Sequence, residues 1–368
     1  MKILHTSDWH LGMELSRISL LEQQRLWGEW LWETVAREKI RVVMVCGDVF
    51  DRAVSTPDAI RLYTDILTNL HKQGAAVVMI AGNHDGAARL STYAPLLEHS
   101  QVYIAGQLES PVKIVEIDQA RFFLIPYYAA DRVKALWTEA TGLVDGTQQV
   151  MESCKQYCTP DKHNIVLAHC FAVGGQPTES DRSAVVGGSA EIPLEVFDGF
   201  DYVALGHIHR PQRLGDTIYY CGTPMKYSFS EANQIKTAPI YDTETGQVTF
   251  LEIPEFVPLR VLEGSLEQLL EQSKNPAYQQ CFMRLIRNDG LADLISQNQL
   301  REAFANVLQI ESRVICEQQM SIPDVSTDNL SAIELLRMFY QEQIGQQPES
   351  TLEEWFLQTL LQQEEQPQ

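Results

Sequence analysis

Five short apolar runs of this chain each lead directly into Asp, Asn or His residues, and this arrangement limits the possible folds more than any other feature. The runs and the polar residues that follow them are 3–6 with Asp8 and His10, 42–46 with Asp48 and Asp51, 77–81 with Asn83, His84 and Asp85, 165–168 with His169, and 203–205 with His207 and His209. Runs of this length are typical of buried parallel strands. Because the carboxyl ends of parallel strands share one edge of an α/β sheet, we expect the polar segments to converge.

The residue types in these segments are those that bind metal ions. The candidate ligands are two carboxylates, one amide and four imidazoles: Asp8, His10, Asp48, Asn83, His169, His207 and His209. They exceed what one tetrahedral zinc ion takes, and mixed nitrogen and oxygen donors suit Mn²⁺, Fe²⁺ or Zn²⁺ better than Ca²⁺. Two ions about 3.5–4 Å apart need a bridging anion, which one carboxylate can supply. The set therefore predicts a dinuclear hydrolase that acts on phosphate esters.

Local geometry supports this prediction. Residues i and i+2 of an extended segment point to the same side, so Asp8 with His10 and His207 with His209 are candidate pairs. Glycines at positions 47, 82 and 206 allow a tight turn and a close backbone approach. Each segment alone has a simpler interpretation as a helix cap or turn, and the metal site rests on the five together.

Alternating apolar and amphipathic stretches predict an α/β chain. We expect strands at 2–5, 41–46, 76–80, 102–104, 112–117, 122–125, 164–168, 202–205, 217–221 and 247–253, and helices at 17–38, 57–72, 131–139 and 146–157. The opening β-α-β-α-β order predicts parallel strands with right-handed crossovers. After 254–258 a second such pattern follows at 259–262, 266–272, 281–287, 291–305 and 313–316, then a polar linker at 321–329 and helices at 331–344 and 352–361.

Composition excludes some classes of protein. No apolar run approaches the roughly 18–20 residues of a membrane span. Seven dispersed cysteines without a CxxC pair predict reduced thiols in a cytoplasmic protein. The net charge of −21, from 28 Lys and Arg against 49 Asp and Glu, argues against a nucleic-acid partner, because duplex binding depends largely on basic side chains.

The motifs D-x-H, GD-x-x-D, GNHD, a lone His after a strand, and GHIH resemble those of the calcineurin-like metallophosphoesterase superfamily. Within it, SDWHLG, GDVFDRAVSTPDAI, AVGGQPTESDRSAVVGGSAEIP, CGTPMKYSFSEA and LSAIELLRMFYQEQIG resemble the SbcD family of bacterial nucleases. The resemblance implies a β-sandwich flanked by helices in 1–256 and a small α/β domain that caps DNA in 257–322. In 323–368 it implies C-terminal helices that bind an ATPase and a disordered end.

The resemblance also implies roles for individual residues. One metal ion would be held by Asp8, His10, Asp48 and His209, and a second by Asp48, Asn83, His169 and His207. His84 would be the catalytic histidine near the scissile phosphate. Asp51 would orient a ligand or cap the helix after position 57, and Asp85 would support His84 or cap the following turn.

The implied activity is that of a Mn²⁺-dependent, ATP-dependent 3′→5′ exonuclease on duplex DNA and an endonuclease on single strands and hairpins, in DNA repair, recombination and replication. The implied partners are the coiled-coil ATPase SbcC and a second nuclease chain, as a homodimer within a heterotetramer. Apolar stripes at Leu335, Leu336, Phe339 and Tyr340 and at Trp355, Phe356, Leu360 and Leu361 are the candidate ATPase-binding element; alternatively, these helices pack on their own domain. Two other functions stay open: a small-molecule phosphodiesterase or phosphatase of the same superfamily, and a non-catalytic scaffold.

Overall fold

The computed structural model describes residues 1–181, 191–290, 293–313, 331–344, 347–348, 352–353 and 355–357. The chain divides into two compact units, Met1–Val314 and Ile315–Gln368. None of the described helices is both long and apolar enough to cross a lipid bilayer.

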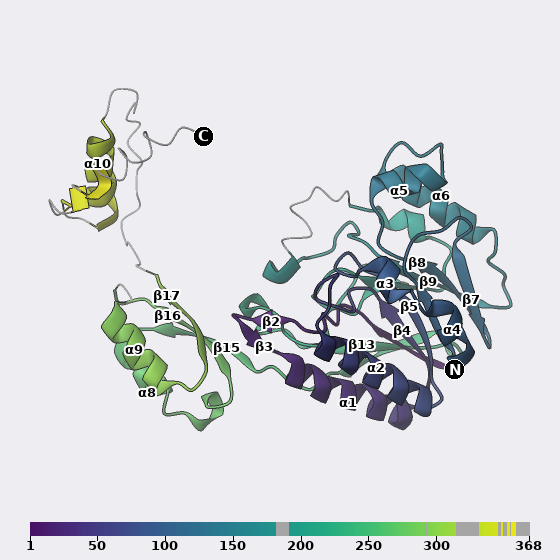
Figure 1. The fold of residues 1–368 in the computed structure, drawn as a ribbon, viewed down its shortest axis with the longest axis horizontal. Helices are drawn as coiled ribbons and strands as arrows, with labels where there is room; N and C mark the ends of the chain where they lie inside the picture. Colours follow the sequence, from purple (N-terminus) through teal and green to yellow (C-terminus); the bar gives the residue numbers. More distant parts are fainter. Residues whose placement is uncertain are drawn as a thin grey trace. The chain divides into compact units, whose positions relative to one another are not determined.

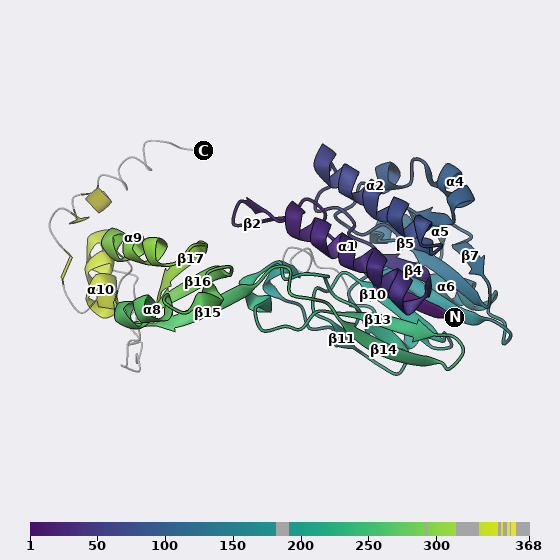
Figure 2. The same ribbon diagram turned by 90° about the horizontal axis from the view of Figure 1, so that it is seen from below.

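The first unit is built on two six-stranded mixed sheets (Figures 1 and 2). The first sheet has the order β14-β13-β1-β4-β5-β6, with β1 at Lys2–Thr6, β4 at Ile40–Cys46, β5 at Ala76–Ile80, β6 at Val102–Ala105, β13 at Thr237–Asp242 and β14 at Gln247–Glu252. The second has the order β11-β12-β10-β9-β8-β7, with β7 at Lys113–Ile117, β8 at Ala120–Ile125, β9 at His163–His169, β10 at Tyr202–Gly206, β11 at Gln212–Arg213 and β12 at Ile218–Tyr220. β1, β4, β5 and β6 run parallel, as do β8, β9, β10 and β12.

The two sheets pack face to face because alternate side chains of each strand enter different cores. Val42 and Met44 of β4 lie in a cluster that also contains Leu167 of β9 and Ala204 of β10. The intervening Val43 and Val45 point to the opposite face and join a second cluster. Period-2 alternation with both faces apolar is the pattern of a strand buried between two layers. The sandwich predicted from the sequence is confirmed.

Helices cover the two outer faces. α1 (Leu21–Glu38) and α2 (Pro57–Lys72) cover the first sheet, with Trp27 and Ile66 in its outer core. Short helices α3 (Ala87–Leu90) and α4 (Ala94–Leu97) follow β5, and α5 (Ala130–Leu136) and α6 (Leu143–Lys155) cover the second sheet. α2 has the bounds predicted from its apolar spacing and from Pro57, and the Thr56 hydroxyl accepts from the Ala59 amide as its N-cap.

The start of one helix and the presence of one strand differ from the predictions. The helix predicted at 17–38 begins only at Leu21, because β2 (Glu14–Leu15) and β3 (Ile18–Ser19) form a hairpin with Ser16 and Arg17 at positive φ. Strand β13 was not predicted, since proline is rare inside strands. Pro239 fits because it lies one residue beyond the part of β13 that pairs with β1.

A smaller parallel sheet has the order β15-β16-β17, with β15 at Leu259–Gly264, β16 at Phe282–Arg287 and β17 at Val307–Ser312. The helices α8 (Leu266–Gln272) and α9 (Leu294–Ala303) pack on it through Leu269, Leu300 and Met283. The third strand of this sheet lies at 307–312, before the predicted range of 313–316, of which only Arg313 is described and lies outside the strand. α9 ends at Ala303, which leaves 307–312 free to pair with β16, and 314–316 lie outside the described residues.

The second unit contains α10 (Ala332–Ile344), which agrees with the helix predicted at 331–344. The Arg337 guanidinium donates to both carboxylate oxygens of Glu353 at 2.6 and 2.7 Å. Leu335 and Trp355 of the two predicted stripes are exposed. The Phe339 side chain, Leu360, Leu361 and the linker at 321–329 lie outside what the structure describes.

Candidate metal centre

The five polar segments predicted to converge do so, but they come from the strand ends of both sheets rather than one. β1, β4 and β5 belong to the first sheet, and β9 and β10 to the second. The segment after β1 pairs with the segment after β4, since the Asp8 amide donates to the Gly47 carbonyl at 3.0 Å and the His10 amide to the Asp48 carbonyl at 2.9 Å. Across the sandwich, the His207 amide donates to the Asp8 carboxylate at 3.1 Å.

At four of the predicted ligands the backbone is left-handed, not extended as we expected. Asp8, His10, Asp48 and His207 have φ values of 52°, 44°, 50° and 102°. Residues other than glycine adopt this region at an energetic cost, although Asp and His tolerate it better than most. Asp8 and His10 still offer ligand atoms to the same group, whereas His207 lies beside Asn83 and His169 and not with His209.

One group of converging atoms centres on His10 and His209. Their Nε2 atoms lie 3.2 Å apart, and His10 Nε2 lies 3.8 Å from Asp48 Oδ2. Asp8, His10 and His209 each offer a ligand atom within 4.8 Å of the others. All four residues are buried.

A second group centres on Asn83, whose amide oxygen lies 3.0 Å from His169 Nε2 and 2.9 Å from His207 Nδ1. The two ring nitrogens lie 3.3 Å apart, and His169 Nε2 lies 3.4 Å from Asp48 Oδ2. His169 Nδ1 donates to the Cys46 carbonyl at 2.8 Å, which leaves Nε2 facing the group. Asp48 is therefore close to both groups.

His84 lies beside these groups with its ring oriented by the backbone. Its Nδ1 donates to the Asp51 carbonyl at 2.9 Å, and its amide donates to Asp48 Oδ1 at 2.8 Å. A carbonyl oxygen only accepts, so Nε2 is the nitrogen left for chemistry. The ring is half-buried, and a ligand atom of His84 lies within 4.8 Å of those of His10 and Asp48.

Asp51 and Asp85 have different surroundings. The Asp51 carboxylate lies 3.9 Å from His10 Nδ1 and 3.3 Å from the Arg52 guanidinium. It does not cap α2, because Thr56 is the N-cap. Asp85 accepts from the amides of Gly82, Val49 and Phe50 at 2.8, 3.2 and 3.0 Å, and so ties the loop after β5 to the loop after β4.

Burial dominates the electrostatics of the centre. It raises the pKa of Asp8, and the neighbouring Asp48 carboxylate raises it further. For Asp48, burial acts in the same direction, but the charges of His169 and His10 hold its pKa well below the usual value. Burial lowers the pKa of His10 to about 4 and that of His207 to about 3. These two imidazoles are therefore neutral near pH 7, the form in which histidine binds metals.

The donor set fits metal binding. Two pairs of imidazole nitrogens and two buried carboxylates face one another, and among the described residues no Lys or Arg forms an ion pair with Asp8 or Asp48. Buried charges require a counter-charge, which a divalent cation provides. These buried His and Asp clusters have the chemistry of a divalent-metal site.

Glycines allow the loops to approach this closely. A Cβ at position 206 would lie 1.9 Å from the Cys46 carbonyl oxygen and 2.2 Å from Ser7 Oγ. Gly47 has a φ of 92°, and a Cβ there would lie 2.3 Å from His169 Nδ1. The predicted role of these glycines is confirmed.

Several side chains that were not predicted from the sequence contact the centre or its backbone. Gln24 of α1 donates to the His10 carbonyl at 2.8 Å, and the Tyr227 hydroxyl donates to the Trp9 carbonyl. The exposed Tyr127 stacks on His207 with ring centroids 6.4 Å apart. Ser180 and Asp181 contact His209. Ser180 and Asp181 lie in the motif at 172–193 and Tyr227 in the motif at 221–232, but the sequence indicated no role for these side chains. Residues 182–190 of the first motif lie outside the described residues.

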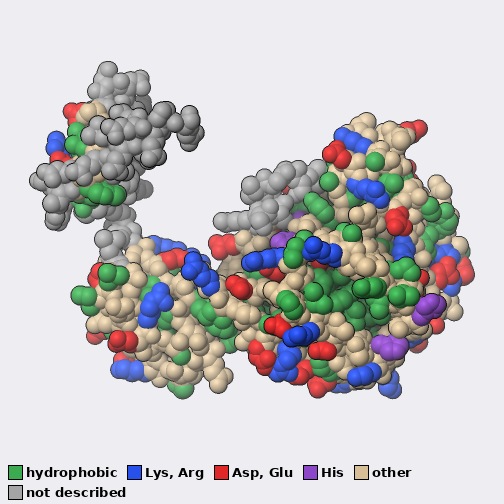
Figure 3. Space-filling view, viewed as in Figure 1, with side chains coloured by type: hydrophobic (Ala, Val, Ile, Leu, Met, Phe, Trp, Pro, Cys, Tyr) green, Lys and Arg blue, Asp and Glu red, His purple; other side chains and the backbone are tan. Residues whose placement is uncertain are grey.

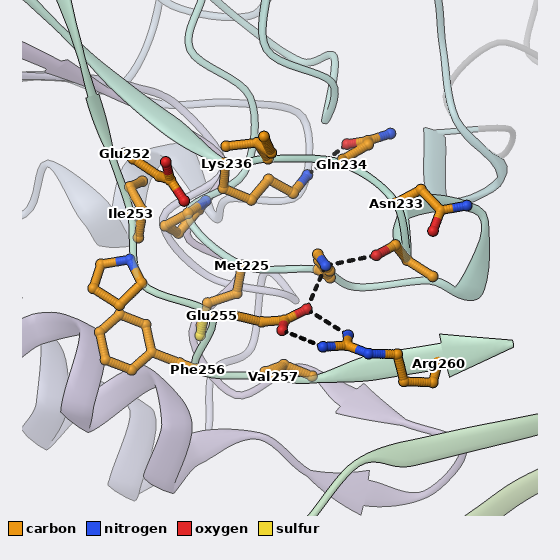
Figure 4. Close-up of a pocket in the computed structure, with 15 residues that line it drawn as sticks. Met225, Asn233, Gln234, Lys236, Glu252, Ile253, Glu255, Phe256, Val257 and Arg260 are labelled. Atoms are coloured by element: carbon orange, nitrogen blue, oxygen red, sulfur yellow. Dashed lines mark hydrogen bonds and ion pairs between the residues drawn. The ribbon is translucent and has the colours of Figure 1, made fainter. Parts of the chain in front are cut away.

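Two cavities lie in this part of the molecule. One of about 180 Å³ opens beside His10, Asp51, His84 and His209, and Tyr227 lines its wall. Another of about 300 Å³ lies where loop 224–236 meets segment 252–260 (Figure 4). In the second cavity, Glu255 pairs with Lys226 and, at 2.8 Å, with Arg260. Of these two cavities, only the first gives access to the predicted ligands.

A family model for calcineurin-like phosphoesterases matches residues 1–211. The match covers more than half of the chain and contains every candidate ligand. The chain therefore belongs to the calcineurin-like phosphoesterase family, and it is a hydrolase of the metallophosphoesterase type.

The remainder of the chain narrows this class. A model for the type 5 capsule protein repressor C-terminal domain matches residues 255–343. The chain is 28% identical over 360 residues to the SbcD subunit of the nuclease SbcCD from Staphylococcus epidermidis, a match that covers 94% of each chain. These findings together make the chain a homologue of the SbcD nuclease subunit.

Two solved structures resemble the chain weakly. A Thermus thermophilus protein is 14% identical with a TM-score of 0.36, and the match covers 69% of this chain and 99% of that one. GAP50, an anchor in the inner membrane complex of Plasmodium, is 11% identical with a TM-score of 0.38, over 87% of this chain and 99% of its own.

Proposed function

We propose that this chain is the metal-dependent nuclease subunit of an SbcCD-type complex. In this role it hydrolyses DNA phosphodiesters, as an ATP-dependent 3′→5′ exonuclease on duplex DNA and as an endonuclease on single strands and hairpins. The chain would act in DNA repair, recombination and replication, in the cytoplasm. The observation that carries the proposal is the convergence of seven ligand-type side chains in a homologue of this nuclease subunit. Two of them, His10 and His209, line an open cavity together with His84.

Two divalent ions, with Mn²⁺ as the expected metal, would occupy the two groups of donors. Asp8, His10, Asp48 and His209 would hold one ion, and Asp48, Asn83, His169 and His207 the other. The position of Asp48 within 3.8 Å of His10 and 3.4 Å of His169 supports its role as the bridge. When bound, such ions acidify a coordinated water and balance the charge of the phosphate.

His84 would act on the phosphate rather than on a metal. The Asp51 carbonyl fixes its Nδ1 proton, and so Nε2 is the atom that can face the substrate. From there it would stabilise charge in the transition state or protonate the leaving 3′ oxygen. Asp51 would orient His84 through its backbone, and Asp85 would hold the loop that carries His84 in place.

The net charge of −21 is compatible with DNA cleavage under this proposal. Ten of the excess negative charges lie in residues 260–368, and two divalent ions would add about +4 at the centre. Acidic and basic side chains are interspersed on the face in Figure 3. Arg52 and Arg210 are exposed and adjoin Asp51 and His209 in sequence. We expect the isolated chain to bind DNA weakly and the ATPase to supply most of the electrostatic grip.

The proposed assembly is a homodimer of this chain within a heterotetramer with an SbcC-type coiled-coil ATPase. The exposed Ile60 of α2, with Tyr93 and Leu96 around α4, offers apolar surface for a second copy. Exposed Leu335, Met338 and Trp355 of the second unit offer apolar surface for the ATPase. In domain terms, 1–256 would be the nuclease domain, 257–322 the capping domain and 323–368 the ATPase-binding segment.

The deciding experiment incubates the purified chain and Mn²⁺ with duplex and hairpin DNA, labelled at either the 3′ or the 5′ end, with and without the ATPase and ATP. We expect metal-dependent cleavage that ATP and the ATPase stimulate on duplex ends, with loss of label from the 3′ end first. Hydrolysis of p-nitrophenyl phosphodiesters without any DNA degradation would identify a small-molecule phosphodiesterase instead. Bound metal without hydrolysis of either substrate would identify a non-catalytic scaffold.

A further inference from the structure

A chain of polar contacts, buried except at the half-buried Ser180, runs from His209 away from the candidate metal centre. His209 Nδ1 lies 2.8 Å from Ser180 Oγ, and Ser180 Oγ donates to Glu231 Oε1 at 2.7 Å. The other oxygen of Glu231 accepts from the Lys236 ammonium at 2.6 Å. Glu231 has no exposed surface, and Lys236 is 4% exposed. Ser180, Glu231 and Lys236 belong neither to the candidate ligands nor to the contacts of His84.

The ion pair at the far end of this chain is almost fully buried. The Lys236 ammonium also donates to the His209 carbonyl and to Thr223 Oγ1, both at 2.8 Å, and to Gln234 Oε1 at 3.0 Å, a contact visible in Figure 4. A buried ion pair is stable only when hydrogen bonds satisfy its remaining donors and acceptors. Its contact with the backbone of His209 joins the pair directly to the predicted ligand.

The direction of the hydrogen bonds fixes the protonation of the His209 ring. An ionised carboxylate only accepts, so Ser180 gives its single hydroxyl proton to Glu231, and Thr178 Oγ1, 2.7 Å from Ser180 Oγ, is the donor in its own contact with Ser180. The Ser180 oxygen must then accept a proton from His209 Nδ1. Asp181, whose Oδ1 lies 3.2 Å from the same nitrogen, can accept that proton as well. Both contacts leave His209 Nε2 unprotonated and facing His10 Nε2 at 3.2 Å.

We propose that Ser180 and Glu231, with Lys236 as counter-ion, are positioning residues that hold His209 in the tautomer that binds metal through Nε2. Hydrogen bonds to the second nitrogen of a histidine ligand fix its orientation and raise its basicity, and their loss typically lowers metal affinity about 10- to 100-fold. The inference rests on the proposed metal centre. We call Ser180, Glu231 and Lys236 the relay. Only the ion that His209 would bind depends on the relay, and the ion that His169 and His207 would bind does not.

The test is a Mn²⁺ titration by calorimetry of the full chain, first stripped with a chelator, in wild type and four variants. Ser180→Ala and Glu231→Gln should each weaken one of two Mn²⁺ sites about 10- to 100-fold and leave the other unchanged. Ser180→Thr, which keeps the hydroxyl, should restore the weakened site. Ser228→Ala is the matched control, because Ser228 Oγ donates to the same Glu231 oxygen at 3.1 Å without a hydrogen bond to His209.

The outcomes separate the relay from the metal centre itself. Wild-type protein that binds no Mn²⁺ would overturn the proposed function together with the relay. Wild-type protein with two sites and a Ser180→Ala variant identical to it would overturn the relay alone. So would equal weakening of both sites with a lower melting temperature of the metal-free chain, since that pattern marks a purely structural role.

Discussion

The Nε2 atoms of His10 and His209 lie 3.2 Å apart although 199 residues separate them in the chain. His10 Nε2 is closer to the His209 nitrogen than to the Asp48 carboxylate, whose Oδ2 lies 3.8 Å away. Two neutral imidazoles in such contact have at most one proton to share, and a cation between their lone pairs makes the arrangement favourable. This contact, more than any single motif, marks the candidate metal site.

The first prediction concerns His84→Gln. Because the His84 ring is held by the Asp51 carbonyl and acts on the phosphate in our proposal, the variant should keep two equivalents of Mn²⁺ and lose about 10²- to 10⁴-fold in DNA cleavage. Metal content by mass spectrometry and cleavage of end-labelled DNA provide the two readouts. Loss of one equivalent of metal together with the activity would make His84 a ligand.

The second prediction concerns the bridging carboxylate. Asp48→Asn should abolish tight binding of both ions, because Asp48 Oδ2 lies within 3.8 Å of His10 and 3.4 Å of His169. Asp51→Asn is the matched control, since the Asp51 carboxylate lies near His10 alone among the predicted ligands, at 3.9 Å. Calorimetric titration with Mn²⁺ compares the two. An Asp48→Asn protein that still binds one ion with wild-type affinity would contradict a bridging role.

A third prediction follows from His5, which is buried in β1 with its Nδ1 3.0 Å from the Tyr202 hydroxyl. Burial lowers its pKa to about 3. The unfolded chain therefore binds a proton near pH 6.5 that the folded chain does not bind, and the free energy of unfolding falls between pH 6.5 and 3. The slope from this one group is at most about 1.4 kcal/mol per pH unit.

Chemical denaturation of the metal-free chain at several pH values measures that slope. His5→Gln cannot titrate and should flatten the curve in this window, whereas His71→Gln, which changes an exposed histidine, should leave it unchanged. Parallel curves for wild type and His5→Gln would show that His5 is protonated in the folded state.

The fourth prediction tests the close backbone approach after β10. Gly206→Ala would place a Cβ 1.9 Å from the Cys46 carbonyl oxygen, so we expect a loss of about 1–3 kcal/mol in the free energy of unfolding and weaker Mn²⁺ binding. In Gly215→Ala the nearest atom would be 3.8 Å away, and the change should stay within about 0.5 kcal/mol. Equal stability of both variants would refute the steric argument.

Most strand positions, and the types of side chain that follow the strands, could be predicted from the sequence because both depend on local patterns. The run 42–46 is apolar at every position, as a strand between two layers requires, and Asp48 follows it closely. The membership of each strand in one sheet or the other could not be predicted. β9 and β10 carry the same apolar signal as β1, and the choice of sheet depends on pairings between residues that are far apart in the chain.

The side chains behind the ligands were unpredictable for a related reason. Gln24 lies on a helix among polar neighbours, and nothing in its spacing distinguishes it from a solvent-exposed residue. Its role exists only because α1 packs beside the loop after β1, where its amide reaches the His10 carbonyl. The end of α9 was misjudged because helical periodicity fades gradually, whereas β17 is defined by its pairing with β16.

The left-handed conformation of Asp8, His10, Asp48 and His207 has an evolutionary consequence. Each such residue costs the native state up to about 1–3 kcal/mol, and glycine would remove most of that cost. Glycine substitutions at these positions, which would abolish the proposed metal binding, are therefore among those that would make the fold more stable. A lineage released from selection for hydrolysis would lose its ligands early and keep its architecture, and a screen for thermostability alone would favour the same inactive descendants.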